Sequence, residues 1–183
     1  MHDTPRTLWT IGHSILAWDA FVARLVDARI ATLVDVRRHA GSRRHPQFSG
    51  ETMVSTLPDA GIAYVPMPDL GGRRSARKDS PNTAWRNASF RGYADYMETP
   101  VFAAAATTLA DIALASHTAV MCAEALWWQC HRALISDRFK ADGWEVLHLR
   151  EGRVEVHPYT KAARIVDGRL DYWLDAPLQA GLF

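Results

Sequence analysis

The chain has 183 residues, of which 48% are hydrophobic and 22% are charged. This length favours one domain with its own core, and the composition is that of a globular protein. A formal charge of +1 argues neither for nor against a nucleic acid partner. No apolar run reaches the roughly 18 residues of a membrane span, and the N-terminus does not resemble a signal peptide. Two cysteines cannot form a disulfide framework, so we expect a cytoplasmic protein with reduced thiols and no membrane partner.

Strand and helix patterns alternate along the first half of the chain. Residues 7–14 form a short apolar run that ends in a polar turn, which predicts a strand. A helical period follows over 18–30. The alternation continues with a strand at 31–37, a helix at 50–61 and a strand at 62–68.

The second half repeats this alternation after a loop rich in glycine and arginine. Residues 90–116 predict two helices, broken near Pro100. A buried strand at 118–124, a helix at 129–143 and a strand at 144–150 follow.

The repeated alternation predicts a single three-layer α/β domain with a mainly parallel sheet, Rossmann-like but without a dinucleotide fingerprint. The core of this domain spans about residues 8–150, and residues 151–183 form an extension. The Asp167-Gly168 pair between apolar residues predicts a β-hairpin in that extension. No internal repeat or linker divides residues 1–183, so we expect one domain.

Polar residues follow the predicted strands at the points where they end. Ligands of open α/β sheets bind beyond the carboxyl ends of the strands, so residues far apart in sequence are expected to meet at one edge. The residues concerned are His13, Ser14, Asp35, Arg37, Asp69, Gly71, Gly72, Cys122 and Glu124.

Three of the candidates at this edge can move protons. Glu124 could act as a general base, a nucleophile or a clamp on a hydroxyl group, or it could orient an arginine through an ion pair. His13 could be a general acid–base or make a loop hydrogen bond. Asp35 could be a catalytic acid or the partner of Arg37.

The stretch AVMCAEALWWQCHRALISD carries both cysteines. Cys130 precedes a helix and adjoins His131, so it is the first candidate for a nucleophile. Three other interpretations stay open. The cysteines could be small buried hydrophobic residues, they could form a redox disulfide, or they could bind a metal with Glu124, His131 or His13, although the spacing is not that of a paired knuckle.

Arginine-rich segments near the same strand ends suit an anionic ligand. In DLGGRR, two glycines allow the backbone to approach a phosphate, while no P-loop or GxGxxG pattern occurs. The predicted substrate- and anion-binding residues are Ser14, Arg37, Arg43, Gly71, Gly72, Arg73, His131 and Arg132.

Five segments together resemble the "domain of unknown function 488" family over about residues 8–150: TIGHS, LVDVRRHAGSRRHPQF, GIAYVPMPDLGGRR, FRGYADYM and MCAEALWWQCHRALISD. The resemblance implies a single α/β domain but no reaction. Two prolines usual in the family are replaced here, around Ala40 and at Trp127. The resemblance marks Gly12, His13, Ser14, Asp35, Arg37, Ser42, Arg43, Pro46, Phe48, Leu70, Gly71, Gly72, Tyr93, Met97, Cys122, Glu124, Cys130, His131 and Arg132.

These observations favour an enzyme that acts on a phosphorylated, nucleotide-like or nucleic acid substrate at the carboxyl edge of the sheet. Its catalytic candidates are Glu124, His13, Asp35 and Cys130. No metal ligands are assigned, and the cofactor and the oligomeric state stay open. The alternatives are a metal- or nucleic-acid-binding module without turnover and a cysteine redox sensor.

Overall fold

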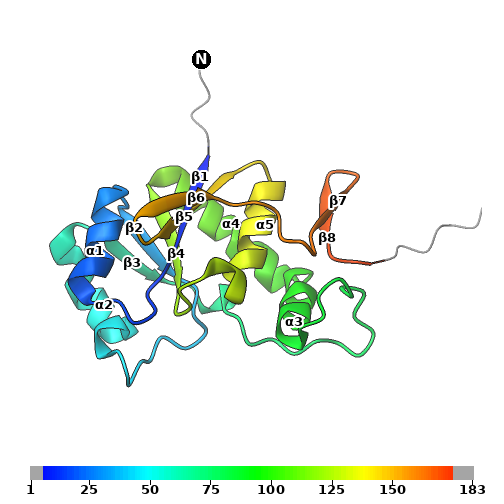
Figure 1. The fold of residues 1–183 in the computed structure, drawn as a ribbon, viewed down its shortest axis with the longest axis horizontal. Coiled ribbons are helices and arrows are strands. Elements are labelled where there is room, and N and C mark those ends of the chain that lie inside the picture. Colours follow the sequence, from blue (N-terminus) through cyan, green and yellow to red (C-terminus); the bar gives the residue numbers. More distant parts are fainter. Residues whose placement is uncertain (1–5, 175–183) are drawn as a thin grey trace, which may run out of the picture.

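A computed structural model describes residues 6–174 of the chain. Its main feature is a six-stranded sheet in the order β3-β2-β4-β1-β5-β6 (Figure 1). Neighbouring strands are parallel except for β5 and β6, which are antiparallel. The strands are β1 (Thr7–Gly12), β2 (Thr32–Asp35), β3 (Ala63–Pro66), β4 (Thr118–Cys122), β5 (Glu145–Arg150) and β6 (Arg153–Val156).

Helices cover both faces of the sheet, which confirms the predicted α/β fold (Figure 1). The α-helices are α1 (Trp18–Asp27), α2 (Gly50–Thr56), α3 (Ala88–Met97), α4 (Pro100–Ala115) and α5 (Arg132–Ala141). Short 3₁₀ helices span Pro46–Phe48, Leu57–Ala60, Pro68–Leu70 and Trp127–Gln129. The predicted break near Pro100 is confirmed, because proline occupies the first turn of α4 and Thr99 caps that helix.

Two hydrophobic cores lie on opposite sides of the sheet. One contains Phe21 of α1 and Met53 of α2. The other contains Tyr93 of α3, Phe102 of α4 and Leu134 of α5. Strands β1, β2 and β4 contribute buried residues to both cores, which explains why their sequences are almost continuously apolar.

The strand order brings three carboxyl ends together. Strand β4 lies between β1 and β2, with Gly12 opposite Cys122 and Asp35 opposite Met121. The backbone amide of His13 then donates to the carbonyl of Cys122 over 3.1 Å. The predicted meeting of distant strand ends at one edge is therefore present at β1, β2 and β4.

The extension after β5 contains the predicted hairpin and one strand that the sequence did not identify. Strands β7 (Arg164–Val166) and β8 (Arg169–Asp171) pair antiparallel across Asp167 and Gly168, whose φ angles of 49° and 76° suit a two-residue hairpin turn. Strand β6 instead joins the main sheet as its edge after a turn at Gly152. Strand β6 was not predicted because it is short and its sequence mixes charged and apolar residues.

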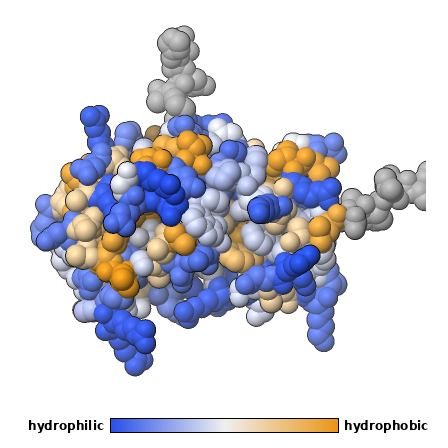
Figure 2. Space-filling model, in the orientation of Figure 1, coloured by the Kyte–Doolittle hydropathy of each residue, from blue (hydrophilic) through white to orange (hydrophobic). Residues whose placement is uncertain are grey.

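The surface of the view in Figure 2 is mostly hydrophilic, with hydrophobic patches over β6 and over the β7–β8 hairpin. Val154, Val156, Ile165 and Val166 are exposed there. Within residues 6–174, no helix has the length and apolar character needed to cross a membrane.

Candidate active site

A cavity of about 380 Å³ opens where strands β2 and β4 end. It extends from these strand ends to the loop after β3 and to the start of α3, so four distant parts of the sequence build it. Its lining residues are Arg37, Arg38, His39, Gly72, Arg73, Asn87, Ser89, Phe90, Tyr93, Cys122, Ala123, Glu124, Gln129, Cys130 and His131. We call this cavity the edge pocket.

The two cysteines are free thiols in contact with each other at the edge pocket. They are only 6% and 7% exposed. A hydrogen bond from Cys130 and the charge of Arg132 lower the pKa of the Cys122 thiol to about 6, and the backbone amides of Ala123 and Glu124 contribute. Burial raises the pKa of Cys130. Of the pair, Cys122 therefore carries the negative charge more readily, whereas the sequence had favoured Cys130.

Arg132 lies behind the edge pocket rather than in its lining. It is 1% exposed. Its guanidinium donates to the carbonyl of Glu124, to Sγ of Cys130 over 3.2 Å and to Oγ1 of Thr10 over 3.5 Å. Arg132, which was predicted to bind an anion, thus donates hydrogen bonds to the protein itself. These bonds hold the loop between β4 and α5 against β1.

A buried row of hydrogen bonds continues from Arg132 to Asp137. Thr10 Oγ1 lies 2.7 Å from Nδ1 of His148, whose Nε2 lies 2.9 Å from Nδ1 of His157. Nε2 of His157 lies 3.0 Å from a carboxylate oxygen of Asp137. If both imidazoles are neutral, every donor can point toward Asp137. The row connects a buried cation to a buried anion, and we call it the buried relay.

Acid should destabilise the protein through His148, which is 1% exposed. Burial, followed by electrostatic interactions with His157, Arg132 and Arg150, lowers the pKa of His148 to about 2. The unfolded chain binds this proton below about pH 6.5, whereas the folded protein does not. Through His148 alone, the free energy of unfolding is therefore unaffected above that pH and falls by about 2 kcal/mol by pH 5. In urea unfolding, His148→Gln should reduce the dependence of the free energy of unfolding on pH. The control His117→Gln, at an exposed histidine, should leave this dependence unchanged. Equal slopes in all three proteins would contradict this expectation.

His131 spans the gap between α5 and β2. Its Nε2 lies 2.9 Å from the carbonyl oxygen of Val36, and its ring lies against Gly72. A Cβ atom on Gly72 would lie 2.7 Å from Nδ1 of His131. The second glycine of DLGGRR thus permits close contact with a histidine ring, and it also lines the edge pocket. Burial also lowers the pKa of His131.

His13, Asp35 and Arg37 form a cluster beside the edge pocket. Arg37 makes a 2.6 Å ion pair with Asp35, and Tyr64 donates to the same carboxylate over 2.7 Å. The ring of His13 stacks on Phe48, and both its nitrogens have polar neighbours. Burial and then Arg37 lower the pKa of His13 to about 4. Only Arg37 of the three lines the edge pocket.

The other predicted residues divide between the pocket and its surroundings. Glu124 and Arg73 are exposed and line the edge pocket. Arg43 is exposed but is not among the lining residues. Ser14 and Gly71 also lie outside the lining. Gly71 packs against Arg38, where a Cβ would come within 2.7 Å of that residue's backbone.

Sequence reasoning missed Asn87 and Ser89, which line the edge pocket beside Phe90, and it missed Thr10, His148, His157 and Asp137 of the buried relay. The side chain of Asn87 caps α3 by accepting from the amides of Ser89 and Phe90. An asparagine just before a helical period is a recognisable helix start, and this signal could have placed the segment at a helix N-terminus.

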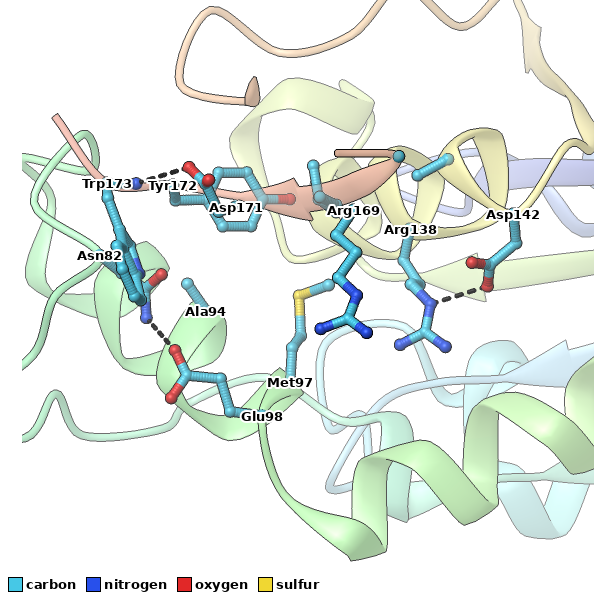
Figure 3. A pocket seen from close by; sticks show the side chains of 13 residues that line it. Asn82, Ala94, Met97, Glu98, Arg138, Asp142, Arg169, Asp171, Tyr172 and Trp173 are labelled. Atoms are coloured by element: carbon cyan, nitrogen blue, oxygen red, sulfur yellow. Dashed lines mark hydrogen bonds and ion pairs between the residues drawn. The ribbon is translucent and has the colours of Figure 1, made fainter. Parts of the chain in front are cut away.

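A second cavity of about 430 Å³ lies between the β7–β8 hairpin and helices α3 and α5 (Figure 3). Asn82 donates to Glu98 at one side of it, and Arg138 pairs with Asp142 at another (Figure 3). Among residues 6–174, no cysteine or histidine lines this hairpin pocket, and its lining lies away from the carboxyl edge of the sheet. The edge pocket is therefore the stronger candidate for chemistry.

Comparison with known families agrees with these observations. A family model described as "Domain of unknown function DUF488" matches residues 17–139. This range includes nearly all of the structure from α1 to α5, and with it the lining of the edge pocket. No curated protein and no solved structure matches the chain. Because the matched range covers well over half of the chain, the protein belongs to the DUF488 family.

Proposed function

We propose that the protein is an enzyme that acts on a small phosphorylated, nucleotide-like substrate in the edge pocket. The observation that carries this proposal is that two exposed arginines, Arg38 and Arg73, line the same cavity as the strand-end residues 122–124. The cavity thus combines anion-binding groups with reactive groups at the place where α/β sheets bind their ligands.

The two arginines are available to an anion. Arg38 donates one hydrogen bond to the carbonyl of Arg73 over 3.2 Å. Across the described residues, neither side chain forms an ion pair with a carboxylate. A guanidinium without an acidic partner suits a phosphate group, which it can bind through two parallel hydrogen bonds.

The rest of the lining suits the organic part of a nucleotide. The ring of Phe90 lines the pocket and stacks on Trp85 at 4.8 Å between centroids, so an aromatic surface is held in place there. Asn87, Ser89 and Gln129 add hydrogen-bonding groups. A volume of about 380 Å³ lies within the roughly 300–1,000 Å³ of small-molecule sites and favours a small ligand over a polymer.

Glu124 is the residue best placed to move a proton. Its carboxylate forms no ion pair with any residue in 6–174. Asp35 is instead paired with Arg37, and His13 is buried outside the pocket lining. A free carboxylate at the pocket can act as a general base toward a bound hydroxyl group or water.

Turnover is tested with a panel of nucleoside mono- and diphosphates and sugar phosphates, followed by ³¹P NMR. We expect the wild-type protein to convert at least one compound and Glu124→Gln to lose about 10²-fold or more of that rate, as removal of a general base does. Full activity of Glu124→Gln would remove the carboxylate from the reaction. Failure to convert any compound that binds would contradict the enzyme proposal.

Binding is tested by calorimetry with adenosine monophosphate. Arg73 has a φ of 60°, so we choose Arg73→Asn, because asparagine tolerates this conformation and removes the charge. Loss of a charged hydrogen bond should weaken binding by about tenfold or more. Arg43→Asn is the matched control, since Arg43 lies outside the lining, and should bind within about twofold of the wild type. Equal losses in both variants would contradict binding at the edge pocket.

A further inference from the structure

We propose that Cys122, Cys130 and His131 form a metal site for zinc or a similar thiolate-binding divalent cation. One ligand atom from each of these residues lies within 4.8 Å of the other two. Cysteine sulfur and imidazole nitrogen are the donors that zinc prefers. The site does not depend on the proposed reaction and can be tested without any substrate.

The three ligand atoms need to move only slightly to bind zinc. Zn–S bonds of about 2.3 Å and Zn–N bonds of about 2.0 Å in a tetrahedron put ligand atoms about 3.5–3.8 Å apart. The present atoms are within 4.8 Å, so each needs to move by about 1 Å or less. Side-chain rotations at the start of α5 can supply such a shift.

The hydrogen bond of His131 leaves the required lone pair free. The carbonyl of Val36 can only accept, so Nε2 of His131 carries the hydrogen and Nδ1 is the nitrogen available to a metal. Most metal-binding histidines are oriented by such a bond from the other ring nitrogen.

Gly72 packs on the same ring without blocking that nitrogen. A Cβ on Gly72 would lie 2.7 Å from Nδ1, 3.2 Å from Cγ and 3.3 Å from Cε1. Such similar distances place it over the face of the ring, whereas the lone pair lies in the plane of the ring. The glycine therefore allows close packing and keeps the approach to Nδ1 clear.

The surrounding charges also suit a cation bound by two thiolates. Arg132 donates to Sγ of Cys130 over 3.2 Å, which stabilises that sulfur as a thiolate ligand. The buried relay connects the charge of Arg132 to Asp137. The other hydrogen bonds of the guanidinium go to the carbonyl of Glu124 and to Thr10, and two thiolates are present to neutralise a divalent cation.

Three protein ligands leave a fourth position for water or a substrate atom. All three residues line the edge pocket, so that position faces the cavity rather than the core. Sites that keep an open position are typical of catalytic zinc, whereas structural zinc has four protein ligands. The proposed cation would therefore meet a ligand held by Arg38 and Arg73.

Cobalt titration of the reduced full-length protein tests the site, because Co²⁺ takes the place of Zn²⁺ and absorbs light. We expect one Co²⁺ per chain, a thiolate-to-cobalt charge-transfer band and displacement by Zn²⁺. Cys122→Ser, Cys130→Ser and His131→Gln each remove a ligand and should weaken binding by about 100-fold or more, since the loss of an outer-shell partner alone costs about 10-fold to 100-fold. His39→Gln is the matched control, because His39 lines the same pocket but lies outside the trio, and it should bind like the wild type.

Circular dichroism of each variant separates loss of a ligand from loss of the fold. If a variant is unfolded, the absorption spectrum of the wild-type protein with Co²⁺ tests the site instead, since only thiolate ligation gives the charge-transfer band. Absence of that band at saturating Co²⁺ in fully reduced protein would overturn the site. Unchanged binding by a folded Cys130→Ser variant would also overturn it. Failure of the phosphate-binding and turnover experiments alone would leave these readouts unaffected.

Discussion

Replacing Arg132 with methionine should lower the free energy of unfolding by about 3 kcal/mol or more, because each buried acceptor left without its donor costs about 1–3 kcal/mol. The side chain is 1% exposed and joins Glu124, Cys130 and Thr10. Methionine fills much of the space but provides no hydrogen-bond donor. The loop between β4 and α5 then loses the guanidinium hydrogen bonds that attach it to Thr10 of β1, and the buried relay loses the donor at its Thr10 end.

Urea unfolding measures this effect, and Arg138→Met is the matched control on the same helix. Arg138 forms a partly exposed ion pair with Asp142 one turn away, so its loss should cost less than about 1 kcal/mol. A change within 1 kcal/mol for Arg132→Met would show that the loop is held by other contacts. A selective loss would identify Arg132 as the anchor of the pocket wall.

Gly12→Ala should destabilise the protein by about 3 kcal/mol or more, because overpacking a rigid site forces the backbone to move. A Cβ at this position would overlap the carbonyl oxygen of Glu124 and lie 2.8 Å from a guanidinium nitrogen of Arg132. Neither neighbour can yield easily, since the two are hydrogen-bonded to each other. The loop that carries Glu124 must therefore shift away from β1.

Gly41→Ala is the control for this substitution, because a Cβ there would have no neighbour within 4 Å. Its stability should stay within about 0.5 kcal/mol of the wild type. Gly12→Ala should also weaken binding of adenosine monophosphate, since Glu124 lines the pocket. Thermal or urea unfolding of both variants checks the first expectation, and calorimetry checks the second. Equal stability of the two variants would contradict the tight contact between β1 and the loop.

The fold was predictable because its signals are local. Buried strands such as residues 118–124 are almost continuously apolar. Pro100 marks the break between two helices and the Asp167-Gly168 pair marks a hairpin turn, and both signals can be recognised from a few neighbouring residues. The spacing between Cys122 and Cys130 was less informative. A strand, a loop and a helix start can place such residues together or apart, and here the contact of the loop with Gly12 and Arg132 determines the outcome.

The buried relay could not be predicted for a related reason. His148 lies in β5 and His157 lies just after β6. In the sequence, a histidine at such a position looks the same whether it faces solvent or the core. Their burial depends on Trp127, which stacks on His148 at 4.6 Å, and on Asp137 from α5. The ion pair of Asp35 and Arg37, which was one of two interpretations of that motif, is present in the structure.

Amide chemical-shift mapping during titration with adenosine monophosphate shows most directly whether the edge pocket binds phosphorylated ligands. A bound nucleotide should shift the amides nearest the two arginines, the start of α3 and the end of β4. The amides concerned are Arg38, Gly72, Arg73, Ser89, Phe90 and Glu124. Shifts confined to Arg169 and Asp171 in the hairpin pocket, or no shifts at millimolar ligand, would contradict binding at the carboxyl edge of the sheet.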